Sequence, residues 1–69
     1  MTVAPKTFSG KRLRLMRERA KMTQIDLAEE SKSTQAQISA WERGRVVPNR
    51  ASIDAMCKAL KCGTEDLCE

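Results

Sequence analysis

The side chains that could carry chemistry in this chain are three thiols, several amides and a group of guanidinium ions. Cysteine occurs only at Cys57, Cys62 and Cys68, and histidine is absent. Structural zinc sites use Cys and His ligands, commonly with a pair of cysteines two residues apart, and no such pair occurs here. We therefore predict no metal and no cofactor. We interpret the cysteines as small apolar side chains, and their odd number as typical of a reducing cytoplasm.

The same residues do not form a recognisable enzyme active site. The chain offers no nucleophile–base arrangement and no glycine-rich phosphate loop, and these are the features by which most active sites are found. We predict that the protein is not an enzyme and binds no small-molecule ligand. No apolar run reaches the length that a membrane span requires, so we also expect no membrane partner and a cytoplasmic location.

Charge is distributed unevenly along the chain, whose net charge is +4. Residues 1–23 carry seven Lys or Arg and one Glu, whereas residues 24–43 carry two Lys or Arg and four Asp or Glu. Residues 44–69 carry four basic and four acidic residues. A basic first segment favours an anionic partner, although a solvated helix face would look the same. Phe8 and Trp41 are the only aromatic residues, too few for a surface that stacks single-stranded bases.

The elements that position these groups are predicted to be short helices. We expect a flexible tail over residues 1–6 and one all-α domain of five helices over residues 7–69, because apolar residues recur at helical spacing and no segment alternates with period two. Side chains that can cap helix N-termini precede each of the first four helices; they are Thr7, Thr23, Thr34 and Asn49. We expect Gly44 and Gly63 to end two helices, with a last helix over residues 64–68.

The stretch from Gln24 to Trp41 reads as two amphipathic helices joined by a tight turn. Asp26 lies three residues after Thr23, and Gln37 lies three residues after Thr34. The second pair has the spacing of a capping box, while the first places a carboxylate in the first helical turn. Both helices therefore begin at well-defined residues.

These residues resemble the Cro/C1 phage-repressor type of helix-turn-helix domain. The resemblance spans about residues 8–68 and rests on a run of residues in the family's order and spacing, namely Leu13, Arg17, Met22 to Gln24, Leu27, Ala28, Ile38, Ser39, Trp41 to Gly44, Pro48, Asn49, Ala59 and Leu60. It implies a compact five-helix, lambda-repressor-like bundle. It also implies a bacterial or phage-encoded, nucleoid-associated transcriptional regulator, most often a repressor. Such a protein binds a double-stranded DNA operator as a homodimer on a pseudo-palindrome.

The resemblance assigns base reading to the outer face of the second motif helix, about residues 35–43. Gln35, Ala36, Ser39 and Ala40 match the positions that face base edges in the family. Gln35 can make a bidentate contact to adenine, in which its amide donates to N7 and its oxygen accepts from the N6 amino group, and the alanines can touch a thymine methyl group. On the residues alone, Gln35 is an ordinary exposed polar side chain, and Gln37 is assigned to capping.

Phosphate contacts and an ion pair follow from the same resemblance. Phosphate contacts fix where a protein sits on the duplex, but they do not read its sequence. The positions that match phosphate-contacting residues of the family are Gln24, Thr34, Arg43, Arg45 and Asn49. Arg17 and Glu42 match a partly buried ion pair of the family. Arg17 also lies on the apolar side of its helix, where an unpaired guanidinium would be costly.

The turn departs from the family pattern. Lys32 stands where the family has a glycine, at a position with positive φ, so we expect backbone strain there. Ser31 and Ser33 replace apolar neighbours and remove buried area from the joint. Ala28 keeps the small residue that close crossing of the two helices requires.

A second function uses the same fold differently. The domain could be a protein-binding adaptor or an antitoxin-like module, with the acidic face of Asp26, Glu29 and Glu30 as its partner surface. A solvated face is the simpler interpretation of those acids. For the DNA-binding dimer, we expect the surface between copies to include Leu67 and Cys68.

Overall fold

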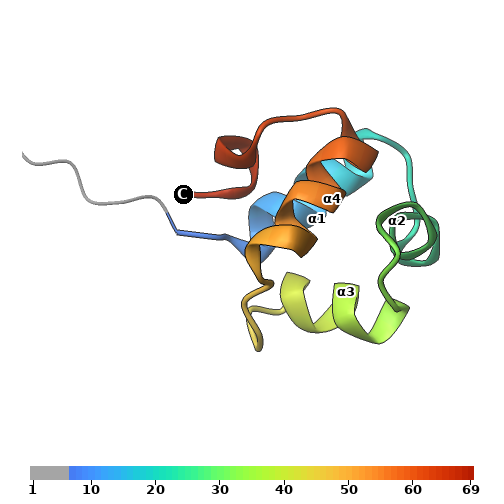
Figure 1. Ribbon diagram of the computed structural model, residues 1–69, viewed down its shortest axis with the longest axis horizontal. Coiled ribbons are helices and arrows are strands. Elements are labelled where there is room, and N and C mark those ends of the chain that lie inside the picture. The colour runs from blue at the N-terminus through green and yellow to red at the C-terminus, as the bar shows by residue number, and fades with distance from the viewer. Residues whose placement is uncertain (1–6) are drawn as a thin grey trace, which may run out of the picture.

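The computed structural model describes residues 7–69; the predicted tail over residues 1–6 lies outside the described residues. Within that range the chain forms four α-helices, α1 (Gly10–Arg19), α2 (Gln24–Ser31), α3 (Gln35–Glu42) and α4 (Arg50–Leu60), followed by the short 3-10 helix η1 (Thr64–Leu67). The all-α prediction is confirmed, but the fifth helix is a single 3-10 turn. In Figure 1, α3 runs along one edge of the domain and η1 lies toward the opposite side.

The first helix begins later than predicted. Ser9, not Thr7, is the N-cap of α1, and its hydroxyl accepts a hydrogen bond from the Arg12 amide at 3.2 Å. Thr7 instead pairs with Glu69 through two backbone hydrogen bonds of 3.1 and 2.9 Å. This pairing joins the two ends of the described chain and holds residue 7 in an extended conformation that a helix could not share.

Each α-helix ends in the same backbone motif. The residue after the last turn adopts the left-handed conformation at Lys21, Lys32, Gly44 and Lys61. The following amide then reaches back to a carbonyl five residues earlier, as in Ser33 to Ala28 at 2.8 Å, which is the Schellman arrangement. Gly44 ends α3 as predicted. The end of α4 was wrongly predicted at Gly63, because Lys61 turns the chain two residues earlier.

The core is one cluster drawn from every helix. Leu13, Leu27, Ile38, Met56 and Leu67 are completely buried. Around this centre lie further buried side chains, which are Ala28, Trp41, Cys57 and Leu60. α2 packs against both α3 and α4, while α1 packs against α3 and η1. The helix pair α2–α3 is therefore held from several sides.

At Gly10 the backbone at the start of α1 lies very close to the backbone at the end of α3. A Cβ atom added there would lie 2.4 Å from the Trp41 carbonyl oxygen and 2.5 Å from that of Glu42. Real side-chain carbon atoms cannot approach an oxygen so closely, so only glycine lets the start of α1 meet the end of α3. This contact could not be predicted from local sequence patterns, because Gly10 and Trp41 are far apart along the chain.

Candidate nucleic-acid interface

Both motif helices begin with reciprocal side-chain caps. The Thr23 hydroxyl accepts from the Asp26 amide at 3.0 Å, and the Asp26 carboxylate accepts from the Thr23 amide at 3.0 Å. At α3, Thr34 and Gln37 make the equivalent bonds of 3.1 and 2.9 Å. These hydrogen bonds lower the pKa of Asp26 below its usual range. The caps fix where each helix starts, and so they fix which residues stand in the first turn of α3.

The turn between the helices keeps its shape despite the departures at residues 31 to 33. Lys32 adopts φ +58°, the left-handed conformation that was expected to be strained. Ser31 is buried, and its hydroxyl donates to the Leu27 carbonyl at 2.7 Å, so its burial leaves no unpaired polar atom. Ala28 is buried where α2 packs on α3. The buried serine is therefore hydrogen-bonded, and the expected strain falls on the left-handed Lys32.

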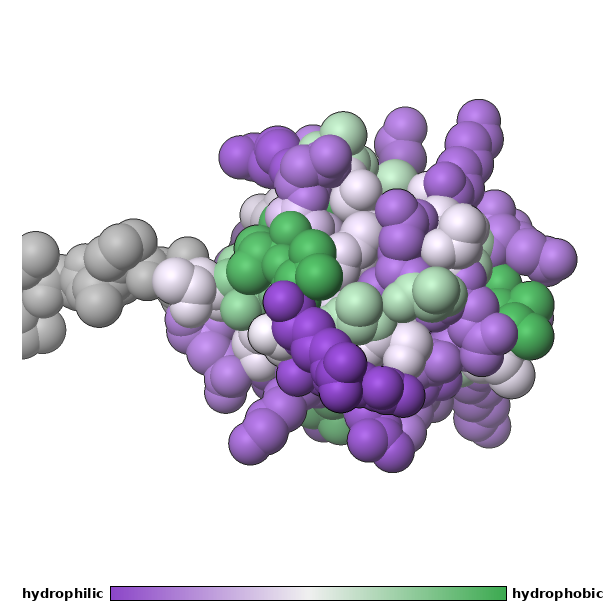
Figure 2. All heavy atoms as spheres, turned by 90° about the horizontal axis from the view of Figure 1, so that it is seen from below, coloured by the Kyte–Doolittle hydropathy of each residue, from purple (hydrophilic) through white to green (hydrophobic). Residues whose placement is uncertain are grey.

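The helix α3 has one buried side and one exposed side. Ile38 is completely buried and Trp41 is 5% exposed, so these two side chains anchor the helix to the core. Gln35 and Ala36 are exposed and Ser39 and Ala40 are partly exposed. The four predicted base-reading positions thus share the accessible part of α3. Figure 2, which views the domain from the α3 side, shows a largely hydrophilic face.

An ion-pair network supports this helix from behind. Arg17 Nε donates to Glu42 Oε2 at 2.6 Å, and Arg17 Nη2 donates to Glu42 Oε1 at 3.2 Å. The two side chains are only 12% and 5% exposed. Arg17 also donates to the Met22 carbonyl at 2.8 Å. The pair joins α1 to the end of α3, and the hydrogen bond with Glu42 raises the pKa of Arg17, which therefore stays charged.

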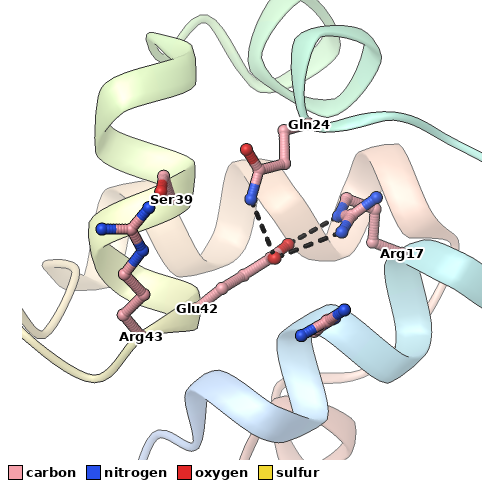
Figure 3. Close-up of a pocket in the computed structure, with 6 residues that line it drawn as sticks. Arg17, Gln24, Ser39, Glu42 and Arg43 are labelled. Carbon is pink, nitrogen blue, oxygen red and sulfur yellow. Dashed lines mark hydrogen bonds and ion pairs between the residues drawn. The ribbon is translucent and has the colours of Figure 1, made fainter.

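Gln24 extends the network toward the exposed face. Its Nε2 donates to Glu42 Oε1 at 3.1 Å, and its Oε1 accepts from Gln35 Nε2 at 3.5 Å. A carboxylate can only accept hydrogen bonds, so Glu42 fixes which end of the Gln24 amide points toward it. Figure 3 shows Gln24 reaching the Glu42 carboxylate from above and Arg17 reaching it from the right. The first residue of α2 thereby touches the first residue of α3.

A polar pocket of about 280 Å³ lies beside the network. Its lining comes from α1, α2, α3 and the residue that follows α3, and consists of Arg14, Arg17, Gln24, Ser39, Glu42 and Arg43. Glu42 neutralises Arg17, which leaves Arg14 and Arg43 as the cations near the opening; Arg14 also pairs with Glu18 at 3.2 Å. This lining suits an anion such as a phosphate group. Sequence reasoning left Arg14 unassigned, although its place in the basic first helix was a signal.

The remaining predicted phosphate contacts surround the ends of α3. Thr34 precedes the helix, while Arg43, Arg45 and Asn49 follow it, and all four are exposed. Asn49 is the N-cap of α4, since its Oδ1 accepts from the Ser52 amide at 2.8 Å. Its Nδ2 donor is left for another acceptor. The contacts of these side chains with a ligand stay a prediction.

The expected surface between copies needs one correction. Leu67 is completely buried against the core and cannot contact a partner, because η1 folds back onto α1 and α4. The exposed large apolar side chains of the described domain are instead Ile25, Val46 and Val47, with 53%, 52% and 70% of their surface exposed. Hydropathy alone did not distinguish them from core residues.

No group of three or more His, Cys, Asp or Glu side chains lies close enough to hold a metal ion within residues 7–69. In the same range, no helix has the length and apolar character needed to cross a membrane.

The arrangement of capped α2, tight turn and anchored α3 defines a helix-turn-helix protein. The family described as "Helix-turn-helix domain" matches residues 10–69. The chain belongs to this family, in its Cro/C1, lambda-repressor-like form.

Solved structures give the same result. The chain is similar to the P22 c2 repressor in a complex with a synthetic operator, with 34% identity, a TM-score of 0.80, and coverage of 84% of this chain and 88% of that one. It is also similar to the restriction-modification controller C.AhdI from Aeromonas hydrophila, with 28% identity, a TM-score of 0.81 and the same coverage. No protein of curated function matches the chain significantly.

One further structural match belongs to an enzyme. Hydroxypropylphosphonic acid epoxidase from S. wedmorenis matches 94% of this chain at 25% identity and a TM-score of 0.81. The match covers only 36% of that chain, so the similarity concerns one domain of a larger protein.

Proposed function

We propose that this protein is a sequence-specific regulator of transcription that binds double-stranded DNA and acts by occupying an operator, without catalysing a reaction. The observation that carries the proposal is the two-sided character of α3. Ile38 and Trp41 bury one side of the helix, while Gln35 and Ala36 stand exposed in its first turn. A helix presented in this way fits the DNA major groove.

The hydrogen-bond network prepares Gln35 for reading a base. Glu42 directs the Gln24 amide so that its oxygen accepts from Gln35. One Gln35 N–H is thereby occupied, while its second N–H and its oxygen stay available. These are the donor and the acceptor that a bidentate contact to adenine requires. In this proposal Ala36, Ser39 and Ala40 contact the neighbouring base edges.

Phosphate contacts would position the helix in the groove. The pocket beside Gln24 combines an amide donor, a hydroxyl and two arginines that are not neutralised by Glu42. It supports a phosphate contact by Gln24 and Arg43, with Arg14 added to the residues predicted from sequence. Thr34, Arg45 and Asn49 would contact phosphates on either side.

The finer parts of the proposal follow the helix-turn-helix regulators that the chain resembles. We infer repression of a bacterial or phage operator in the cytoplasm, with two copies on a pseudo-palindromic site and their recognition helices about 34–36 Å apart. A two-fold site requires a self-complementary contact between the copies.

A selection from random duplex DNA tests the proposal. We expect recovery of a palindromic consensus, bound by the full chain in fluorescence anisotropy, with binding that weakens as salt rises. Gln35→Ala should remove the preference at one base-pair position of the consensus, while Glu29→Gln on the exposed part of α2 should preserve the preference at every position. Weak binding that is indifferent to sequence would contradict the proposal.

The adaptor alternative loses part of its surface in the structure. Asp26 is engaged in the cap of α2, so only Glu29 and Glu30 remain of the three acids assigned to a protein partner. If no DNA sequence is enriched, a protein-binding function becomes the better account of the same fold.

A further inference from the structure

Two of the three thiols meet at the end of α4, on a part of the domain that the proposed DNA contacts do not use. Cys57 lies in the last turn of the helix and is 7% exposed, and Cys62 follows the helix and is partly exposed. Both are free thiols. Neither the core packing nor the DNA-binding proposal requires a sulfur atom at both positions.

The backbone brings these residues together. The Cys62 amide donates to the Cys57 carbonyl at 3.0 Å, and the Lys61 amide donates to the Lys58 carbonyl at 3.3 Å. With Lys61 in the left-handed conformation, these are the two bonds of a Schellman motif. The motif places the side chains of its first and last residues in contact, and here both of those residues are cysteines.

The two thiols also influence each other. Burial raises the pKa of Cys57 to about 12, and the nearby Cys62 thiol adds to the effect. Burial also raises the pKa of Cys62, but the nearby Cys57 thiol acts in the opposite direction. Cys62, which is also the more exposed of the two, is therefore the sulfur that reacts first.

We propose that Cys57 and Cys62 form a reversible disulfide that closes the C-terminal turn of α4. The residues meet in the contact that the motif imposes, so a bond between them needs little movement of the backbone. The oxidant would be a small-molecule disulfide. The proposal is independent of DNA binding, since it concerns a different part of the domain.

The reaction takes two exchange steps. The accessible Cys62 thiolate attacks one sulfur of the small disulfide, which forms a mixed disulfide on Cys62 and releases one small thiolate. The Cys57 thiol then loses its proton to the released small thiolate and attacks the Cys62 sulfur, which forms the protein disulfide and releases the second small thiolate. Two protein thiols are oxidised, one small disulfide is reduced to two thiols, and the two protons pass from the protein thiols to the released thiolates.

Oxidation by glutathione disulfide, followed by mass spectrometry of the folded chain, tests this assignment. We expect the intact mass to fall by about 2 Da, with no lasting glutathione adduct on Cys62. Trypsin cleaves after Lys58 and Lys61, so peptides 51–58 and 62–69 should stay joined until a reductant is added. Separate peptides, or a stable adduct on Cys62, would overturn the proposal.

Cys68 supplies a matched control, because it is partly exposed like Cys62 but lies elsewhere, in a β-bridge with Phe8. Cys68→Ser should still give the joined peptides, which in that variant can only be linked through Cys57 and Cys62. Cys62→Ser should give none. If Cys57 is unsuitable for substitution in the core, these two variants still decide the question: loss of the link in Cys68→Ser would refute the assignment.

Discussion

Removing Glu42 should expose how strongly α3 depends on its ion pair. In Glu42→Ala, the Arg17 guanidinium loses two of its three hydrogen bonds and keeps only the one to the Met22 carbonyl. The Arg17 side chain is only 12% exposed, so its guanidinium would stay largely buried without the carboxylate that pairs with it. Breaking a buried pair by removing one partner costs about 3–5 kcal/mol.

That loss is large for a domain of this size. At about 0.05–0.15 kcal/mol per residue, a chain of 69 residues has a free energy of unfolding of roughly 3–10 kcal/mol. Urea denaturation followed by the fluorescence of Trp41, which adjoins Glu42 and is 5% exposed, would measure the change directly. We expect Glu42→Ala to lower the urea midpoint sharply, and to bring it close to zero if the free energy of unfolding lies at the lower end of that range.

The chain carries its own control for this measurement. Arg14 and Glu18 form an ion pair whose side chains are 66% and 52% exposed. Exposed pairs contribute about 0–1 kcal/mol, so Glu18→Ala should leave the midpoint nearly unchanged. Replacing both partners, with Arg17→Met and Glu42→Leu together, should recover most of the stability. If the free energy of unfolding of Glu42→Ala lies within about 1 kcal/mol of the wild-type value, the reasoning from burial is refuted.

Three further predictions concern the scaffold. Lys32→Gly should raise the free energy of unfolding by about 1 kcal/mol in urea denaturation, because glycine accepts the left-handed conformation without strain; a lower midpoint would contradict the strain assigned to this turn. Gly10→Ala should lower the stability by about 1–3 kcal/mol through overpacking against the Trp41 carbonyl, and an unchanged thermal midpoint would show that α1 can move away. The hydrogen bonds with Thr23 lower the pKa of Asp26. The ionised Asp26 carboxylate therefore adds to the free energy of unfolding above the ordinary carboxyl pKa of about 3.9, and this stabilisation is lost as the pH falls through the folded-state pKa. Asp26→Asn should therefore flatten the acid limb of a pH-stability curve, and an unaltered acid limb would exclude this capping contribution.

Features set by neighbouring residues were predictable from the sequence. The caps at Thr23, Thr34 and Asn49 depend on side chains reaching amides within one helical turn, which spacing alone reveals. The anchoring of α3 by Ile38 and Trp41 was equally visible. These local signals, together with the family resemblance, predict the ends of α2 and α3 to within one or two residues of the observed bounds.

Features set by distant residues were not predictable. Thr7 fails to start α1 because it pairs with Glu69 at the other end of the described chain. Gly10 is required by Trp41, and Arg12 Nε donates to the Asp66 carbonyl at 3.1 Å. The role of Gln24 combines a local position with a contact to Glu42 that only packing creates. The sequence predicts that Gln24 contacts a phosphate group, and the structure adds a hydrogen bond from Gln35 to Gln24.

The most direct test of base reading by α3 compares single base-pair variants of the selected duplex in fluorescence anisotropy. Gln35→Ala should remove discrimination at one base-pair position, a loss of about 1–3 kcal/mol or roughly 5- to 150-fold in affinity ratio, and leave the other positions discriminated. Arg43→Ala should instead weaken binding to every duplex alike and reduce the salt slope by about 1. If Gln35→Ala weakens all duplexes equally and keeps every preference, α3 does not read bases through this side chain.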